Sequence, residues 1–221
     1  MLRTSIAVAA ALGATCVLAA CGPVRTGAAA IVGGQRISAT TLSNEVASLE
    51  QAYQANKAKI QLQFPLAQAP QQVLGWLVRF RVRDQLAIRN HVRVSFGQSQ
   101  RALAAIAAQA GPNGIRNLAV ANGLPPDLLP ALGRYAAIQN ALVARLDGGR
   151  VPSSTAAQQA LGADLNRRQC AAAKSLHILI NPQFGRLDYT QLSVIPAANR
   201  LSAPESSSPS SSPRPALAPP C

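Results

Sequence analysis

The stretch from Pro70 to about Asn90 constrains the fold of this chain most. Its apolar residues recur at helical spacing and also fill most of the positions between, so a helix here has little purely polar face. Such a helix is usually central to a domain, and Pro70 suits its first turn. We therefore predict a central helix, with Arg79, Arg81 and Arg83 reaching outward past the packing to keep their charged ends in water. Its apolar positions are Val73, Leu74, Leu77, Val78, Phe80, Val82, Leu86 and Ile88.

The composition points to the same fold class. Hydrophobic residues make up 48% of the 221 residues and aromatic residues only 4%, so a core must be built from Ala, Leu, Ile and Val, which favours helices over a β-sandwich. Only 13% of the residues are charged, and the chain has two His and eight carboxylates. Such a chain has few of the side chains that acid–base catalysis and metal binding usually require. We expect no enzyme, no cofactor and no metal ion.

Further helices are predicted before and after the central one, over 40–62, 98–110 and 115–121, from the turn at 124–127 to 146, and over 155–175. Ser95 and Gln98 match a capping box ahead of the third helix. Two short strands flank a Gly33-Gly34 turn, and an apolar strand is expected over 176–180. The predicted class is mainly α, a helical domain with a few short β-strands.

The first twenty residues have the pattern of a targeting segment. Arg3 gives a positive start, and the uncharged run over 6–18 is too short for a transmembrane helix, which needs about 20 apolar residues. Leu18-Ala19-Ala20-Cys21 then resembles the bacterial lipobox, in which the thiol is lipid-modified and the chain is cut before it. We predict a lipoprotein signal peptide over 1–20 and a protein anchored by lipid on Cys21 to the extracytoplasmic face of the cell membrane. The alternative is an ordinary secretory signal cleaved near Ala20.

The mature chain divides into three parts. A small-residue tether is predicted over 21–30, and a Ser/Pro-rich tail over 202–221 cannot bury a core and is predicted to be disordered. The remaining 31–201 has the size of one domain. Within it Cys170 is expected to be a small core residue, and a structural disulfide between Cys170 and Cys221 is not expected.

The charge is strongly one-sided, with 21 Lys and Arg against eight acidic residues and a formal net charge of +13. Outside the membrane, anionic lipid headgroups, acidic polymers of the envelope or negatively charged client chains are more plausible partners than nucleic acid, which we do not expect. We take Arg79, Arg81 and Arg83 as candidate contacts to such an anionic surface. An Arg-rich composition without any ligand is the alternative.

No arrangement of polar residues matches a known catalytic or metal-binding pattern. His177 follows Cys170 by seven residues, a separation that metal sites seldom use, and is interpreted as a partly exposed strand residue. His91 follows the central helix, where a cation is favoured by the helix dipole. The sequence has no Gly-rich phosphate loop, no Gly-x-Ser-x-Gly elbow and no paired carboxylates.

Several short motifs are similar to those of a known family. The run Ile31-Val32-Gly33-Gly34-Gln35-Arg36-Ile37-Ser38, followed by a long helix, resembles the start of SurA- and PrsA-type foldases. The Ser95–Gln98 capping box and the order of Asn122-Gly123-Leu124 before a helix carrying Arg134 resemble the next elements. The run from Leu176 to Gly185 resembles a strand plus an Asn-Pro-Arg-[Tyr/Phe]-Gly ending of actinobacterial lipoproteins with a SurA-like N-terminal domain. Gln183 departs from the Arg of that ending, which puts any role of that Arg in doubt here.

The resemblance implies an ATP-independent holdase for unfolded or exported polypeptides. The prolyl isomerase module of the family has no room in the short 147–154 connection, so we expect no isomerase activity. Tyr53, Phe64, Trp76 and Phe80 are the candidate client-binding side chains, although a core position is favoured for each. The alternative function is a structural or adaptor lipoprotein that binds one envelope partner or an anionic polymer. A holdase needs a broad apolar cradle, whereas an adaptor needs a compact patch with mixed polar contacts.

Overall fold

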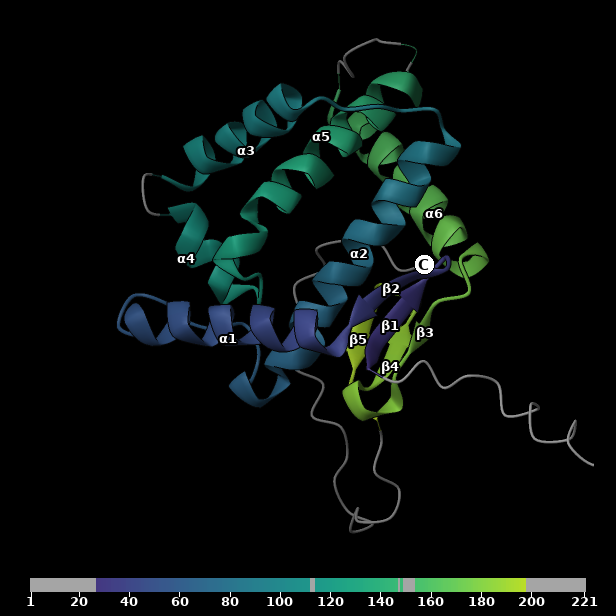
Figure 1. Cartoon of the computed structure of the whole chain (residues 1–221). Helices are drawn as coiled ribbons and strands as arrows, with labels where there is room; N and C mark the ends of the chain where they lie inside the picture. Colours follow the sequence, from purple (N-terminus) through teal and green to yellow (C-terminus); the bar gives the residue numbers. More distant parts are fainter. Residues whose placement is uncertain (1–26, 112–113, 147, 149–153, 198–221) are drawn as a thin grey trace, which may run out of the picture.

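The computed structural model describes residues 27–111, 114–146, 148 and 154–197 (Figure 1). The predicted class is confirmed, because long helices are joined by a few short antiparallel strands. The predicted signal peptide and Ser/Pro tail lie outside the described residues. In chain order the elements are β1 (Ala28–Val32), β2 (Gln35–Ser38), α1 (Ala39–Ala55), η2 (Leu66–Gln68), α2 (Ala69–Arg89), α3 (Phe96–Ala110), α4 (Gly114–Ala121), η3 (Pro126–Leu128), α5 (Leu129–Leu146), α6 (Thr155–Ser175), β3 (Leu179–Ile180), η4 (Pro182–Phe184), β4 (Arg186–Asp188) and β5 (Ser193–Ile195).

A three-stranded antiparallel sheet joins the two ends of the described domain. The predicted hairpin is present, with Gly33 and Gly34 both at positive φ (55° and 83°) in the two-residue turn between β1 and β2. On its other edge β1 pairs with β3, with Ala30 opposite Ile180. The predicted tether is wrong over its last three residues, 28–30, because they form the middle strand of this sheet and are buried.

The helix boundaries follow local capping signals. The capping box is confirmed, since Ser95 Oγ accepts from the Gln98 amide at 3.2 Å and Gln98 Oε1 accepts from the Ser95 amide at 2.7 Å. The sixth helix begins and ends where the sequence predicts. The first does not, because α1 ends at Ala55 rather than 62 and the chain then turns.

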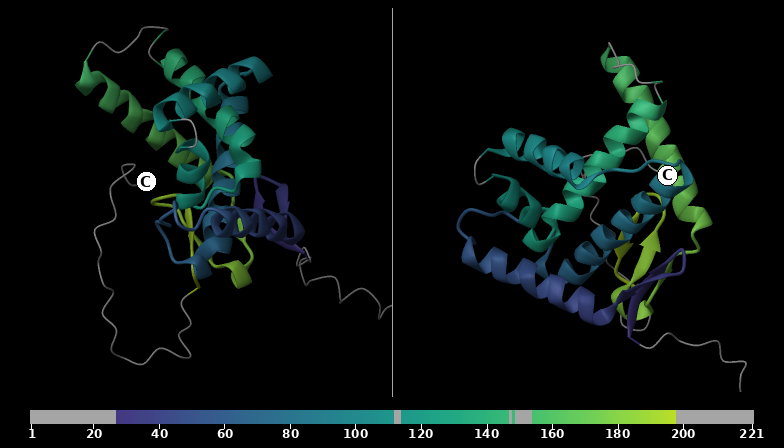
Figure 2. Two further views of the ribbon diagram at one scale, coloured as in Figure 1. Left: turned by 90° about the vertical axis from the view of Figure 1, so that its left-hand side faces the viewer. Right: turned by 45° about the horizontal axis from the view of Figure 1, so that its top comes forward.

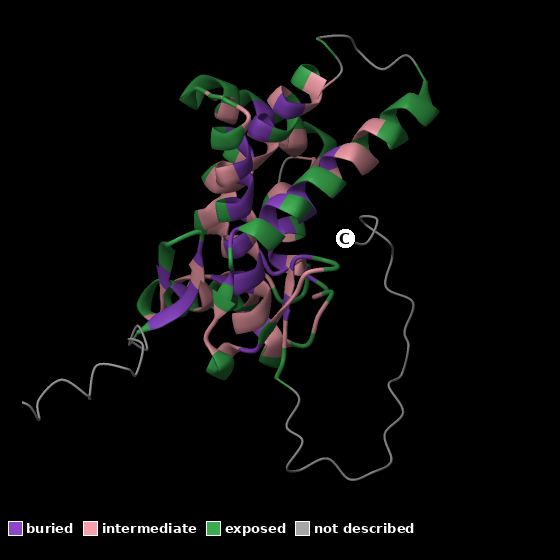
Figure 3. Ribbon diagram, turned by 90° about the vertical axis from the view of Figure 1, so that its right-hand side faces the viewer, coloured by how far each residue is buried: buried purple, intermediate pink, exposed green. Residues whose placement is uncertain are grey.

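Helix α2 is central, as predicted. It contributes buried residues to three apolar clusters: the first shared with the sheet, α1 and the β5 segment, the second with α5 and α6, and the third with α4 and α5. Figure 3 shows this burial concentrated in the body of the molecule, whereas the first turns of α6 are exposed and project beyond it. No helix of the described segments combines the length and apolarity needed to cross a bilayer.

The C-terminal part differs from the prediction in two ways. The expected strand over 176–180 is reduced to β3, because His177 takes a left-handed conformation (φ 46°) that interrupts it. A second two-stranded sheet, β4–β5, was not predicted, and it packs against α2, where Gly75 lies close to the backbone of Val194. Helices α3, α4 and α5 lie on the other side of α2 from this hairpin (Figures 1 and 2).

Candidate functional site

The four candidate client-binding aromatic residues lie in or against the core. Tyr53 and Phe64 pack on the first cluster, and Phe80 is part of the third. Trp76 also packs on the third cluster, and its indole Nε1 donates to the Asn122 carbonyl at 3.0 Å. Phe80 is buried, as the favoured core position predicts. The other three are partly buried against a core cluster, so none of the four is fully exposed.

The three candidate arginines do not form one surface. Residues four apart share a helix face and residues two apart do not, so Arg79 and Arg83 point one way and Arg81 the other. Arg81 is exposed. Arg79 Nε donates to the Leu192 carbonyl at 3.0 Å, and its guanidinium lies over the Trp76 ring at 5.1 Å. The prediction that all three reach into water is wrong for Arg83, whose residue is only 3% exposed.

Arg83 joins α2, α5 and α6 through neutral partners. Its Nη2 donates to the Tyr135 hydroxyl at 2.6 Å and to Gln169 Oε1 at 2.5 Å, and the guanidinium lies 4.1 Å from the centre of the Tyr135 ring. Burial lowers the pKa of the guanidinium, and Tyr135 partly opposes that shift. Arg83 Nε is buried without a hydrogen-bond partner. This residue is therefore a structural junction rather than a surface contact for anions.

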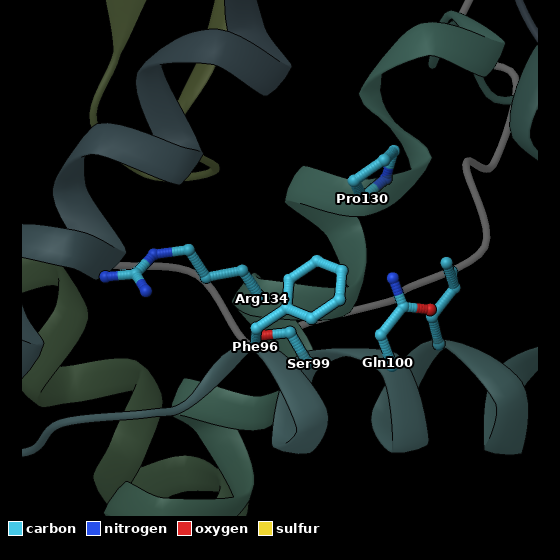
Figure 4. A pocket seen from close by; sticks show the side chains of 6 residues that line it. Phe96, Ser99, Gln100, Pro130 and Arg134 are labelled. Atoms are coloured by element: carbon cyan, nitrogen blue, oxygen red, sulfur yellow. The ribbon is translucent and has the colours of Figure 1, made fainter.

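An exposed groove lies between α3 and α5. It has a volume of about 240 Å³ and is mostly apolar. Phe96 at the start of α3 is 77% exposed, and Figure 4 shows its ring between Arg134 and Gln100, facing the side of α5 that carries Pro130. The groove is lined by Phe96, Ser99, Gln100, Leu103, Pro130 and Arg134.

Gly133 lets α3 and α5 approach closely beside this groove. A Cβ atom at Gly133 would lie 2.7 Å from the Ser99 carbonyl oxygen and 2.9 Å from Leu103 Cβ. Only a residue without a side chain lets α3 and α5 approach this closely. One feature of the sequence could have indicated the site. Phe96 and Leu103 are seven residues apart and share a helix face, so the apolar face of α3 begins with a large side chain at its first residue.

Positive charge beside the groove comes from Arg134 and from the N-terminal end of α3. Arg134 Nε bonds Asp84 Oδ1 at 2.9 Å across to α2, with half of the Arg134 side chain exposed. Arg101 does not line the groove, because it is two residues from both Ser99 and Leu103 on α3 and therefore points away from the face that they share. The helix dipole gives the N-terminal end of α3 a partial positive charge, and its first turn carries no acidic residue to oppose that charge.

A second cavity of about 240 Å³ lies where α2 and α5 end against α6. Arg145 and Arg168 line it, but the helix ends there carry partial negative charge, which disfavours an anion. Arg168 is also paired with Asp164 at 2.8 Å, and this hydrogen bond is the main cause that lowers the pKa of Asp164. This cavity is therefore the weaker candidate.

The remaining polar candidates form no site. Among the described residues no group of three His, Cys, Asp or Glu side chains is placed to hold a metal ion. His177 is exposed, in a turn rather than on the predicted strand. Cys170 is buried as predicted, and it is disulfide-bonded. The prediction against a Cys170–Cys221 bond stays a prediction. Cys16, Cys21 and Cys221 all lie outside the described residues.

The Asn181–Gly185 motif has a structural role. The Asn181 side chain donates to the Ala28 carbonyl at 3.0 Å and accepts from the Gln183 amide at 3.1 Å, which caps η4 and ties it to β1. Phe184 packs on the first core cluster. The Gln183 side chain is exposed, so its difference from the Arg of the similar motif does not affect this turn.

No protein-family model, curated protein or solved structure matches this chain. The similarity to SurA- and PrsA-type foldases therefore stays a prediction from short motifs. The α3–α5 groove is the candidate site on geometry alone.

Proposed function

We propose that this chain is a lipid-anchored extracytoplasmic lipoprotein that binds unfolded or exported polypeptides as a chaperone-like holdase, without catalysis. The observation that carries the proposal is the exposed Phe96 ring at the edge of the α3–α5 groove. A large apolar side chain left in water beside an apolar groove is typical of a surface that binds another chain.

The size of the groove fits a side chain rather than a cofactor. An apolar cavity of about 150 Å³ accommodates benzene, whereas small-molecule sites usually measure about 300 Å³ or more. A groove of about 240 Å³ suits one aromatic or branched side chain with part of its backbone. Burial of such a side chain stabilises a complex by roughly 25 cal/mol per Å² of apolar surface, which gives weak, reversible binding.

The test is suppression of aggregation of an unrelated denatured protein by the chain from Gly22 onward. We expect suppression at near-stoichiometric ratios, weakened by Phe96→Ala. Ile88→Ala is the matched control, because Ile88 is also exposed (63%) but lies on α2 and does not line the groove. A well-folded chain that suppresses no aggregation would rule out the holdase.

A specific observation also favours the adaptor alternative. Among the described residues, the large exposed apolar ones belong to four different elements: Ile88, Phe96, Leu118 and Leu179. The α3–α5 groove is small and bordered by charge. A compact patch with mixed polar contacts is what an adaptor for one envelope partner needs. Without aggregation suppression, recovery of one envelope protein or polymer on the immobilised wild-type chain but not on the Phe96→Ala variant is the expected result.

A further inference from the structure

The α3–α5 groove combines an apolar surface with positive charge that is only partly neutralised. Its lining is mostly apolar, with Phe96 and Leu103 from α3 and Pro130 from α5. Two sources of positive charge border it: the exposed half of Arg134 and the N-terminal end of α3. A ligand for this groove therefore gains from one apolar group and one negative charge held close together.

The charge near the groove is only partly balanced. Asp84 pairs with Nε of Arg134, and no other hydrogen bond of Arg134 is formed within the described chain. The two terminal nitrogens of the Arg134 guanidinium are thus left to donate to a second carboxylate. The second cavity has arginines as well, but it adjoins helix C-terminal ends, where an anion is disfavoured.

We propose that the groove takes a polypeptide segment in which one large apolar side chain is adjacent in sequence to Asp or Glu. The apolar side chain lies against Phe96 and Leu103, and the neighbouring carboxylate accepts from Arg134. This inference rests on the proposed function, since it names the segment that the same groove binds. Charge complementarity and groove volume together select the segment, because a purely apolar side chain leaves Arg134 unused and a purely acidic one leaves the groove empty.

The experiment uses fluorescence anisotropy with labelled eleven-residue Gly/Ser peptides that carry Glu-Phe-Glu, Gln-Phe-Gln, Lys-Phe-Lys or Glu-Ser-Glu at the centre. The protein is the chain from Gly22 to Cys221, which contains every described residue. We expect the Glu-Phe-Glu peptide to bind about two- to fivefold more tightly than the Gln-Phe-Gln peptide, since exposed ion pairs contribute modestly. The Lys-Phe-Lys and Glu-Ser-Glu peptides should bind more weakly than either.

Four variants separate the groove from general charge attraction. Phe96→Ala should weaken both Phe peptides alike, at least about threefold, because it removes an aromatic contact. Arg134→Gln should weaken only the Glu-Phe-Glu peptide. Asp84→Asn breaks the same ion pair yet releases Arg134, so it should strengthen binding of that peptide. Lys174→Gln removes one positive charge at the end of α6 and should change nothing beyond a small general effect.

The two proposals fail in different ways. Equal binding of the acidic and basic peptides, or equal loss with Asp84→Asn and Arg134→Gln, overturns the acidic–apolar preference and shows that the ion pair acts through stability alone. If the Phe96→Ala variant binds the peptides and suppresses aggregation as well as the wild type does, the holdase function stands and the groove is the wrong site. If no peptide binds and no aggregation is suppressed, the proposed function itself fails.

Discussion

Gly185 in the Asn181–Gly185 motif is held in a conformation and a space that only glycine fits. Its φ is +122°, and a Cβ atom there would lie 2.2 Å from the Ile195 carbonyl oxygen and 3.1 Å from the Ile195 carbonyl carbon. Those are backbone atoms of the β4–β5 sheet, where Arg186 pairs with Ile195. The sheet cannot easily give way, because Val194 is buried and lies close to Gly75 of α2.

Gly185→Ala is therefore expected to destabilise the domain strongly. The backbone conformation costs an alanine about 1–3 kcal/mol, and forcing a methyl group into a packed site costs about another 1–3 kcal/mol. The sum, roughly 2–6 kcal/mol, is a large part of the about 5–15 kcal/mol that holds a typical domain folded. For a domain of this size, that change lowers the midpoint of thermal unfolding by roughly 5–20 °C.

The assay is urea unfolding followed by circular dichroism, with two matched controls. Gly34 also has positive φ (+83°), but a Cβ atom there would meet nothing within 4 Å, so Gly34→Ala should cost only its backbone strain, about 1–2 kcal/mol. Gln183→Arg restores the residue of the similar motif at an exposed position and should change stability by less than about 0.5 kcal/mol. If Gly185→Ala loses no more stability than Gly34→Ala, the clash with Ile195 is not real and the reasoning is refuted.

Three further predictions concern ionisation, redox state and anchoring. Burial, and to a smaller extent the charge of Asp127, raises the pKa of Glu45, so its ionised form destabilises the fold above that pKa. The Glu45→Gln variant should therefore be more stable than the wild type at pH 7, and the difference should shrink toward pH 4. A pH-independent effect, or an equal effect of Glu50→Gln at an exposed position, argues against this assignment. Cys170 should resist alkylation in the unfolded, unreduced chain and react after reduction, and peptide mapping should find its disulfide partner; labelling before reduction would contradict the bond. Cys21→Ala should abolish lipid labelling and release the protein from membranes, and retained labelling would disprove this anchor.

Sequence patterns predicted the elements whose determinants are local. The capping box at Ser95, the Gly33-Gly34 turn and the bounds of α6 depend on neighbouring residues, so the sequence alone sufficed. The β4–β5 sheet escaped prediction because its strands are three residues each and are stabilised by packing on α2. The burial of Ala28 could not be predicted from the run of small residues around it, because the partner strand β3 lies about 150 residues away in sequence.

The candidate site was missed for a different reason. A large aromatic residue is most often buried, and that rule places Trp76 and Phe80 correctly. It fails for Phe96, because whether the first residue of a helix is covered depends on how the next helix passes it. Gly133 brings α5 against Ser99 and Leu103, one to two turns further on, and leaves Phe96 outside.

The net positive charge of this chain is obtained by counting residues, but in the structure the arginines have different physical roles. The Arg83 charge is buried, and Arg79 closes the loop before β5 by donating to backbone carbonyls. Arg167 and Arg168 share the single carboxylate of Asp164. Guanidinium groups that serve as donors to neutral oxygens inside the fold add to the net charge without creating a surface for anions. An anionic ligand is instead attracted where positive charge is exposed, has donors left over and lies beside an apolar surface. In the described chain the α3–α5 groove meets all three conditions, and there the charge of Arg134 and the exposure of Phe96 act on the same ligand.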